Sequence, residues 1–209
     1  MKTLKILTML MVLTCGAQVV LAQGPTRMED RKRQMDSIRY EQQFHKDLLE
    51  NPVKYPCYVK DDDEWFAASN NMEGELGDPK LANALLQSCQ EQLYMKLSGR
   101  VKQLGSYNFD YVNANKERKA ANHIESLCQK EVNQLVMETR EACREHIVHP
   151  SPYKQDKIIL FMAIQVRKID LLKVMEEAIK NDEEAKVRFN EQKFRDAYSK
   201  AFEDNKQQE

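Results

Sequence analysis

Residues 158–166 are apolar at every position except Gln165. An apolar run of this kind is typical of a β-strand covered on both faces, so the fold has to place an apolar layer on each side of it. Residues 139–148 carry β-tolerant side chains in imperfect alternation, and a rigid Pro-containing turn follows at 149–152. We therefore expect the two segments to pair as a hairpin with a long connection. Residues 64–69 are predicted to form a further short strand.

Two long segments between these strands have the apolar spacing of buried helices. In the first, apolar residues recur four or three positions apart: Leu85, Cys89, Leu93, Leu97, Val101 and Leu104. Asp78-Pro79 predicts the start of this helix and Gly105 its end. The second helix is predicted over 116–138. The predicted fold class is α+β: a small antiparallel sheet packed by two long helices, in a core domain over 57–180.

A charged helical segment and a Pro-rich linker are predicted over residues 23–56. The helix covers 27–50, and its apolar positions are few and widely spaced: Met28, Met35, Ile38, Phe44, Leu48 and Leu49. A stripe this narrow cannot stabilise an isolated helix, yet it is too regular for a disordered tail. This helix is therefore predicted to need a partner.

A charged C-terminal helix is predicted over 181–209, after a shorter helix over 169–180. It carries a narrow seam: Val187, Asn190, Phe194, Ala197, Tyr198, Ala201 and Phe202. One continuous helix over 169–205 would be ~55 Å long, so we expect the tail to project or to pack on 27–50. The helices at 27–50 and 183–204 are predicted to provide surfaces for self-association or for docking envelope proteins.

The N-terminus has the pattern of a secretory signal peptide. Lys2 and Lys5 precede an uncharged apolar run over 6–21, and Ala22 supplies a small residue at its end. The run is shorter than the roughly 20 residues of a membrane-spanning helix. Residues 1–22 are therefore predicted to be cleaved after Ala22, and the mature protein is expected in the periplasm or at the outer membrane.

A lipid anchor is an alternative form of export. Val12-Leu13-Thr14-Cys15-Gly16 partly resembles a bacterial lipobox, although Thr14 is a poor match and the apolar run continues beyond Cys15. Attachment to a membrane is expected only if Cys15 is lipidated.

Composition and motifs exclude several classes of function. The chain has 32 Lys and Arg against 33 Asp and Glu, so it lacks the basic excess of a nucleic-acid-binding protein. It has no Gly-rich phosphate loop, Ser-centred elbow or metalloprotease helix motif, and no cofactor or metal is predicted. The acidic run at 61–64 lacks the spacing of a calcium loop and is read as a solvated segment. An enzyme built on this run or on Cys143 is a weak alternative.

Four cysteines remain after cleavage, and an even number in an exported protein permits disulfides. Cys89 and Cys128 lie on the apolar faces of adjacent predicted helices, so this is the pairing favoured by the pattern. Cys57 with Cys143 is the alternative bridge. Cys89 and Cys128 could equally be buried thiols, because free cysteine behaves as a small apolar residue.

Aromatic residues are the candidate contact residues. Trp65 and Phe66 are adjacent in a predicted strand, so one side chain is expected inside the sheet and the other outside. Phe194, Tyr198 and Phe202 are the aromatic members of the C-terminal seam. A cleft near Trp65 and Phe161 would instead suit a periplasmic module that binds a small ligand.

The order strand, long helix, helix, two strands and helix resembles the lipoprotein-20-like family of bacterial cell-envelope proteins. The resemblance covers about residues 58–180 and is carried by Leu81-Ala82-Asn83-Ala84-Leu85, Lys96-Leu97-Ser98-Gly99-Arg100-Val101 and the strand at 158–167. It implies a helix packed across a small sheet and supplies no catalytic set. The sequence as a whole predicts an exported, non-enzymatic protein of structural or assembly type that acts through protein contacts.

Overall fold

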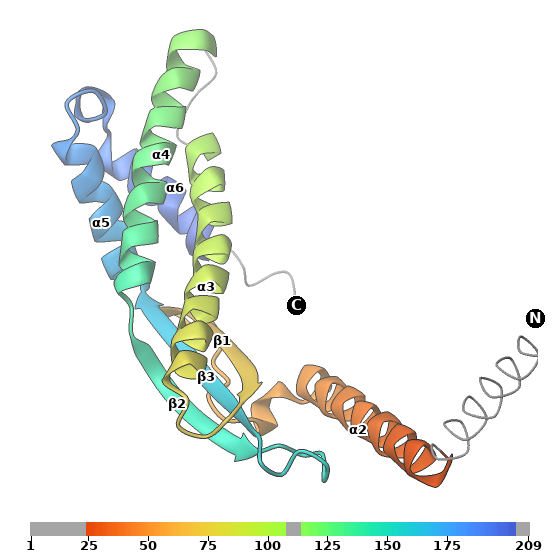
Figure 1. Cartoon of the computed structure of the whole chain (residues 1–209). Helices are drawn as coiled ribbons and strands as arrows, with labels where there is room; N and C mark the ends of the chain where they lie inside the picture. The colour runs from red at the N-terminus through yellow and green to blue at the C-terminus, as the bar shows by residue number, and fades with distance from the viewer. Residues whose placement is uncertain (1–23, 108–113, 204–209) are drawn as a thin grey trace, which may run out of the picture. The chain divides into compact units, whose positions relative to one another are not determined.

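The computed structural model describes residues 24–107 and 114–203 (Figure 1). In chain order its elements are α2 (Gly24–Glu50), the 3-10 helix η1 (Pro52–Lys54), β1 (Trp65–Gly74), α3 (Pro79–Tyr107), α4 (Ala114–Glu138), β2 (Glu141–Val148), β3 (Ile158–Arg167), α5 (Lys168–Asn181), η2 (Lys186–Arg188) and α6 (Glu191–Glu203). Over these residues the fold is α+β, as predicted. The predicted signal peptide, its cleavage after Ala22 and the lipobox at Cys15 lie outside the described residues.

Within the described ranges, no helix combines the length and the apolar character that crossing a bilayer requires. The chain divides into two compact units. Unit 1 consists of described residues up to Pro52 together with 149–155. Unit 2 consists of Val53–Val148 and the described residues from Asp156 onward. The C-terminal segment therefore belongs to the same compact unit as the sheet.

Unit 2 is built on a three-stranded sheet in the order β1–β3–β2. Both pairings are antiparallel, so the predicted hairpin of β2 and β3 is confirmed. Because β3 is central and has layers on both faces, every residue from 158 to 166 is buried except the half-buried Gln165. The apolar run is thus explained by burial of both faces of β3, as the sequence indicates.

Strand β1 is longer than predicted. It continues through Asn70 and Asn71 to Gly74, and the pairing with β3 extends to Gly74 opposite Ile158. The predicted end of this strand at residue 69 is therefore wrong. Two asparagines are tolerated because β1 is an edge strand, and Asn70 Nδ2 donates a hydrogen bond to Ser88 Oγ at 2.8 Å.

One face of the sheet packs on α3, which packs in turn on α4 (Figure 1). This face carries Leu160, Met162 and Ile164, and it meets the apolar side of α3, where every position of the predicted four-and-three pattern is buried. Lys80 N donates to Asp78 Oδ1 at 2.9 Å, so Asp78 caps α3 as predicted. The helix continues to Tyr107, two residues beyond the predicted stop at Gly105.

The other face of the sheet is covered by residues 55–64, which we call the strap. The Tyr55 ring stacks on Phe161 with centroids 5.9 Å apart. A disulfide joins Cys57 to Cys143, which lies opposite Ala163 in the β2–β3 ladder. Phe161 and Ala163 are almost completely buried. The strap thus provides the second layer that the apolar strand requires.

The C-terminal region does not form one long helix. Helix α5 ends at Asn181, and Asp182 Oδ1 then accepts hydrogen bonds from Glu184 N and Ala185 N, which turns the chain. Helix α6 returns to the core, where Phe202 contacts the ring of Phe66 at 5.7 Å. The expectation that this tail projects or packs on 27–50 is wrong, because its apolar seam completes the core of unit 2.

Unit 1 consists of α2 and the loop 149–155. Polar contacts connect them: Lys154 Nζ pairs with Glu41 Oε1 at 2.7 Å, Ser37 Oγ lies 3.4 Å from Ser151 Oγ, and Tyr153 Oη donates to Asp36. Phe44 is the buried apolar residue of α2. The predicted helix over 27–50 is confirmed, and it begins at Gly24.

Candidate functional site

An exposed apolar face on α2 is the first candidate site. Met28, Met35, Ile38 and Leu49, which we call the α2 stripe, have exposed fractions of 75%, 71%, 47% and 82%. Phe44 and the half-buried Ser37, Glu41 and Leu48 occupy the side of the helix that the loop 149–155 contacts. Exposed apolar residues on one side of a helix are typical of a surface that binds another helix.

A cavity of about 540 Å³ in unit 2, which we call the α5 cleft, is the second candidate. Its lining comes from three separate parts of the chain: Asp63, Glu64, Arg167, Lys168, Ile169, Leu172, Arg195, Tyr198 and Ser199. Ile169 and Leu172 supply apolar surface, and the charged groups surround them. A volume of several hundred Å³ is in the range of small-ligand sites.

The arginines of the α5 cleft are already paired with carboxylates. Arg167 makes two hydrogen bonds to Asp170, at 2.7 and 3.1 Å. Arg195 makes two to the buried Glu176, at 2.7 and 3.1 Å, and pairs with Glu191 at 2.8 Å. The hydrogen bond to Glu176 is the main reason that the pKa of Arg195 is raised above its ordinary value. The positive charges of these two arginines are therefore balanced by carboxylates of the protein itself.

Tyr198 and Lys168, which also line the cleft, make contacts that stabilise the fold. Tyr198 Oη donates to the carbonyl of Lys168 at 2.8 Å, and the Lys168 ammonium lies 5.0 Å from the centroid of the Phe66 ring. These contacts connect the start of α5 to α6 and to β1. Sequence reasoning missed the cleft, because its residues are brought together only by the packing of α5 and α6.

The α5 cleft is not the cleft near Trp65 and Phe161 that the sequence suggested. Phe161 is buried beneath Tyr55, and neither Phe161 nor Trp65 lines the α5 cleft. The neighbouring Asp63 and Glu64 do line it. The expected alternation at Trp65 and Phe66 is confirmed: Phe66 is buried, whereas Trp65 is half-buried.

The aromatic contact residues predicted in the C-terminal seam are core residues. Phe194, Tyr198 and Phe202 are buried, and the rings of Tyr198 and Phe202 stack with centroids 4.4 Å apart. Phe66 meets Phe202 in the same cluster. Their role as surface contacts is corrected, because the seam is covered by the protein's own sheet and helices.

The acidic run at 61–64 has structural partners that the sequence did not reveal. Asp61 Oδ1 accepts from Lys96 Nζ at 2.7 Å and from Ala67 N at 2.9 Å. Asp62 Oδ1 accepts from Glu64 N at 2.8 Å and from Trp65 N at 2.7 Å. These contacts fasten the end of the strap to α3 and to the start of β1.

The favoured disulfide between Cys89 and Cys128 is wrong: both residues are free and buried, and the bridge joins Cys57 to Cys143. The physical reason is direction, since Cys89 Sγ points at the sheet and donates to the Met162 carbonyl at 3.5 Å. Burial raises the pKa of Cys89 to about 11 and that of Cys128 to about 12. Both are protonated at neutral pH and are poor nucleophiles.

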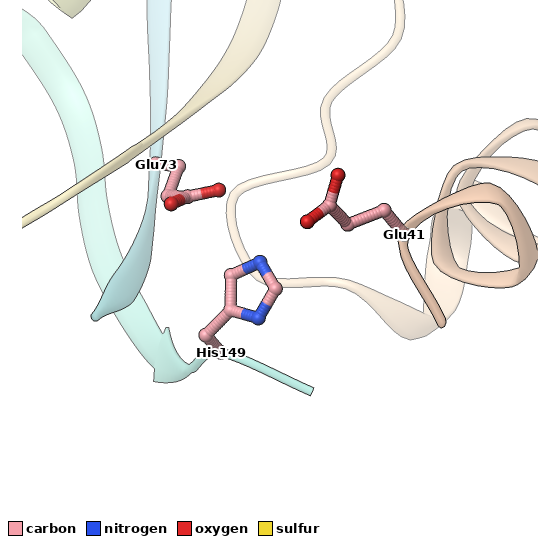
Figure 2. Close-up of side chains that lie close together, drawn as sticks. All are labelled: Glu41, Glu73 and His149. Atoms are coloured by element: carbon pink, nitrogen blue, oxygen red, sulfur yellow. The ribbon is translucent and has the colours of Figure 1, made fainter. Parts of the chain in front are cut away.

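Figure 2 shows three side chains with metal-binding chemistry: Glu41 on α2, His149 after β2, and Glu73 on β1. Only the first two belong to unit 1. Glu41 Oε1 is occupied by Lys154 Nζ, whose hydrogen bond is the main reason that the pKa of Glu41 lies below its ordinary value of 4.5. His149 Nδ1 accepts from Ser151 N at 3.1 Å. We assign no metal site to unit 1, because both side chains have partners within the unit.

No family model matches the chain, and no curated protein and no solved structure is similar to it at a significant level.

Proposed function

We propose that this chain is an exported, non-enzymatic protein of structural or assembly type that acts through protein–protein contacts. In this proposal unit 2 is a stable scaffold, and α2 is the helix that binds the partner protein. The observation that carries the proposal is the α2 stripe, where Met28, Met35 and Leu49 are each more than two-thirds exposed. Exposed apolar side chains in a row are costly in water and mark contact sites.

Export is supported by the disulfide between Cys57 and Cys143, because such bonds persist in the periplasm and outside the cell. The proposal places the mature chain in the periplasm or at the outer membrane, with cleavage after Ala22. N-terminal sequencing of the mature protein is expected to begin at Gln23. A blocked, lipidated N-terminus at Cys15 would favour the lipoprotein form of export.

A non-enzymatic role is supported by the state of the candidate chemical groups. The free thiols of Cys89 and Cys128 are buried and protonated, Cys143 is in a disulfide, and Asp61 is paired with Lys96. The Cys143 sulfur and the Asp61 carboxylate, two groups of the sequence-based enzyme alternatives, thus have structural roles. The resemblance to lipoprotein-20-like envelope proteins agrees with this proposal.

The test compares two pairs of substitutions on α2 in the full chain. Met35→Gln with Ile38→Gln removes the centre of the α2 stripe, whereas Arg33→Gln with Tyr40→Gln changes exposed residues elsewhere on the helix. After mild crosslinking of intact cells, we expect the wild type and the control pair in larger complexes and the stripe variant as monomer. The same complexes in all three would overturn the proposal.

A second candidate is a small-ligand-binding module, and the α5 cleft is the observation that favours it. In this alternative the ligand would contact Ile169 and Leu172 and meet charged groups at the rim. Leu172→Trp is expected to fill the space. A ligand from an amphiphile panel that raises the Tm of the wild type but not of Leu172→Trp would support this function; equal shifts in both would exclude it.

A further inference from the structure

We infer that α2 binds an acidic amphipathic helix of another protein, which packs on the α2 stripe and pairs with a row of basic side chains beside it. The inference rests on the proposed function and specifies the chemistry of the partner.

The α2 stripe follows a seven-residue repeat. Met28, Met35, Gln42 and Leu49 are seven residues apart, and Ile38 and His45 follow Met35 and Gln42 by three. This is the a and d spacing of a helix that packs along another helix. All six side chains are exposed. A second helix could therefore lie along α2 for three heptads, and the polar residues at the other a and d positions, Arg31, Gln42 and His45, would fix its register.

Basic residues occupy one flank of the α2 stripe. Lys32, Arg39 and Lys46 stand at the e position of successive heptads, so they form a row next to the apolar residues, and all three are exposed. Lys46 Nζ lies 3.8 Å from Glu50 Oε1, near the upper limit for an ion pair, and both side chains are more than half exposed. This ion pair is therefore weak. Charged residues at e positions determine which helix binds, and the basic residues at these positions favour a partner that carries carboxylates.

The other flank of the stripe does not supply those carboxylates to a second copy. Its g positions are Gln34, Glu41 and Leu48; Glu41 is held by Lys154, and Leu48 is half-buried. In a parallel pair of α2 helices, basic e positions would meet these g positions. In an antiparallel pair, the basic row would face its own copy, and like charges repel. The pattern therefore favours a different, acidic helix over self-association.

An anionic membrane is a weaker fit than an acidic helix. Over residues 28–50 the acidic side chains slightly outnumber the basic ones. A helix that lies on an anionic bilayer instead has a polar face rich in Lys and Arg. Three of the five basic side chains over 28–50 form one row beside the α2 stripe, which suits a narrow partner.

The experiment measures binding of two synthetic helical peptides to the full mature chain. Both carry Leu and Ile at a and d; one has Glu at the flanking positions and the other has Lys. At low ionic strength we expect the Glu peptide to bind about tenfold more tightly or better. The triple variant Lys32→Glu, Arg39→Glu and Lys46→Glu is expected to reverse the preference. Arg33→Glu, at an outward position on α2, is the matched control and should retain it.

The other outcomes separate the two proposals. Equal or tighter binding of the Lys peptide overturns the acidic partner. If the chain forms concentration-dependent dimers that require Met35 and Ile38, the partner is a second copy of this chain and not an acidic helix. If the chain binds phosphatidylserine vesicles and the triple variant does not, the partner is a membrane. In the case of dimers, the role of α2 in protein contacts still stands. The proposed function itself is contradicted when loss of Met35 and Ile38 leaves every crosslinked complex unchanged.

Discussion

Cys57 and Cys143 are joined by a disulfide that holds the strap over the outer face of the sheet. Cys143 lies opposite Ala163, two residues from Phe161, on which Tyr55 of the strap stacks. A covalent bond and an aromatic contact thus both attach the strap to the same face of the sheet. The strap thus covers the face of β3 that carries Phe161 and Ala163, which is the face opposite α3.

Removing the disulfide should destabilise unit 2 strongly. The bridge spans a sequence separation of 86 residues, for which the chain-entropy model gives about 4–5 kcal/mol. Denaturant unfolding of the wild type is expected to shift to lower denaturant on addition of dithiothreitol. The double variant Cys57→Ser with Cys143→Ser should unfold at that lower concentration with or without reductant. A wild-type midpoint that does not respond to reductant would contradict the assignment.

Truncation of Phe202 tests whether α6 belongs to the core. Phe202 is buried against Phe66 and Tyr198, so Phe202→Ala is expected to lower the free energy of unfolding by about 3–5 kcal/mol. Val187→Ala is the control on the same C-terminal segment, and because Val187 is exposed its effect should stay within about 0.5 kcal/mol. Similar small effects of both substitutions would mean that α6 is an independent extension.

Stability should fall in acid through Asp182. Hydrogen bonds from the backbone N–H of Ala185 and from His123 lower the pKa of this carboxyl below its ordinary value of 3.8. The contribution of the ionised Asp182 to the free energy of unfolding is therefore fully present above the ordinary pKa of 3.8. It is lost as the pH falls through the lower pKa of the folded state. Unfolding measured against pH should show the wild type exceeding Asp182→Asn at neutral pH, with the difference shrinking in acid. A difference that grows in acid would contradict the sign.

The two free thiols should be inert in the native protein. Cys89 and Cys128 are buried, and burial raises their pKa values to about 11 and 12. Iodoacetamide at neutral pH is expected to leave both unlabelled in the folded chain and to label both in denaturant without reductant, as read by mass spectrometry. Rapid labelling of either thiol in the folded protein would reopen the case for a cysteine nucleophile.

Burial that repeats with a regular period could be predicted from the sequence. The four-and-three spacing from Leu85 to Leu104 and the apolar run of β3 both have a local signature, so the α+β fold and the elements beside the sheet follow from them. The second half of β1 has no such signature. Asn70 and Asn71 are strand residues only because β3 offers them a partner along its full length.

Pairings that depend on the path of a loop could not be predicted. Cys57 reaches Cys143 because the strap crosses the sheet, and no spacing of cysteines encodes that crossing. A narrow apolar seam is equally ambiguous. The seams at Phe194–Phe202 and Met28–Leu49 look alike in the sequence, yet the first is buried in unit 2, whereas four of the six apolar residues of the second are exposed. Only the folded chain separates a core helix from a docking helix.

The most direct test of the account is site-specific photocrosslinking from α2 in living cells. A benzoylphenylalanine placed at Met35 samples the α2 stripe, and one placed at Arg33 samples an exposed outward position on the same helix. We expect irradiation to join a discrete second protein to the chain from position 35 and not from position 33. A chain that stays monomeric from position 35, or that gives the same products from both positions, would contradict a docking role for this helix.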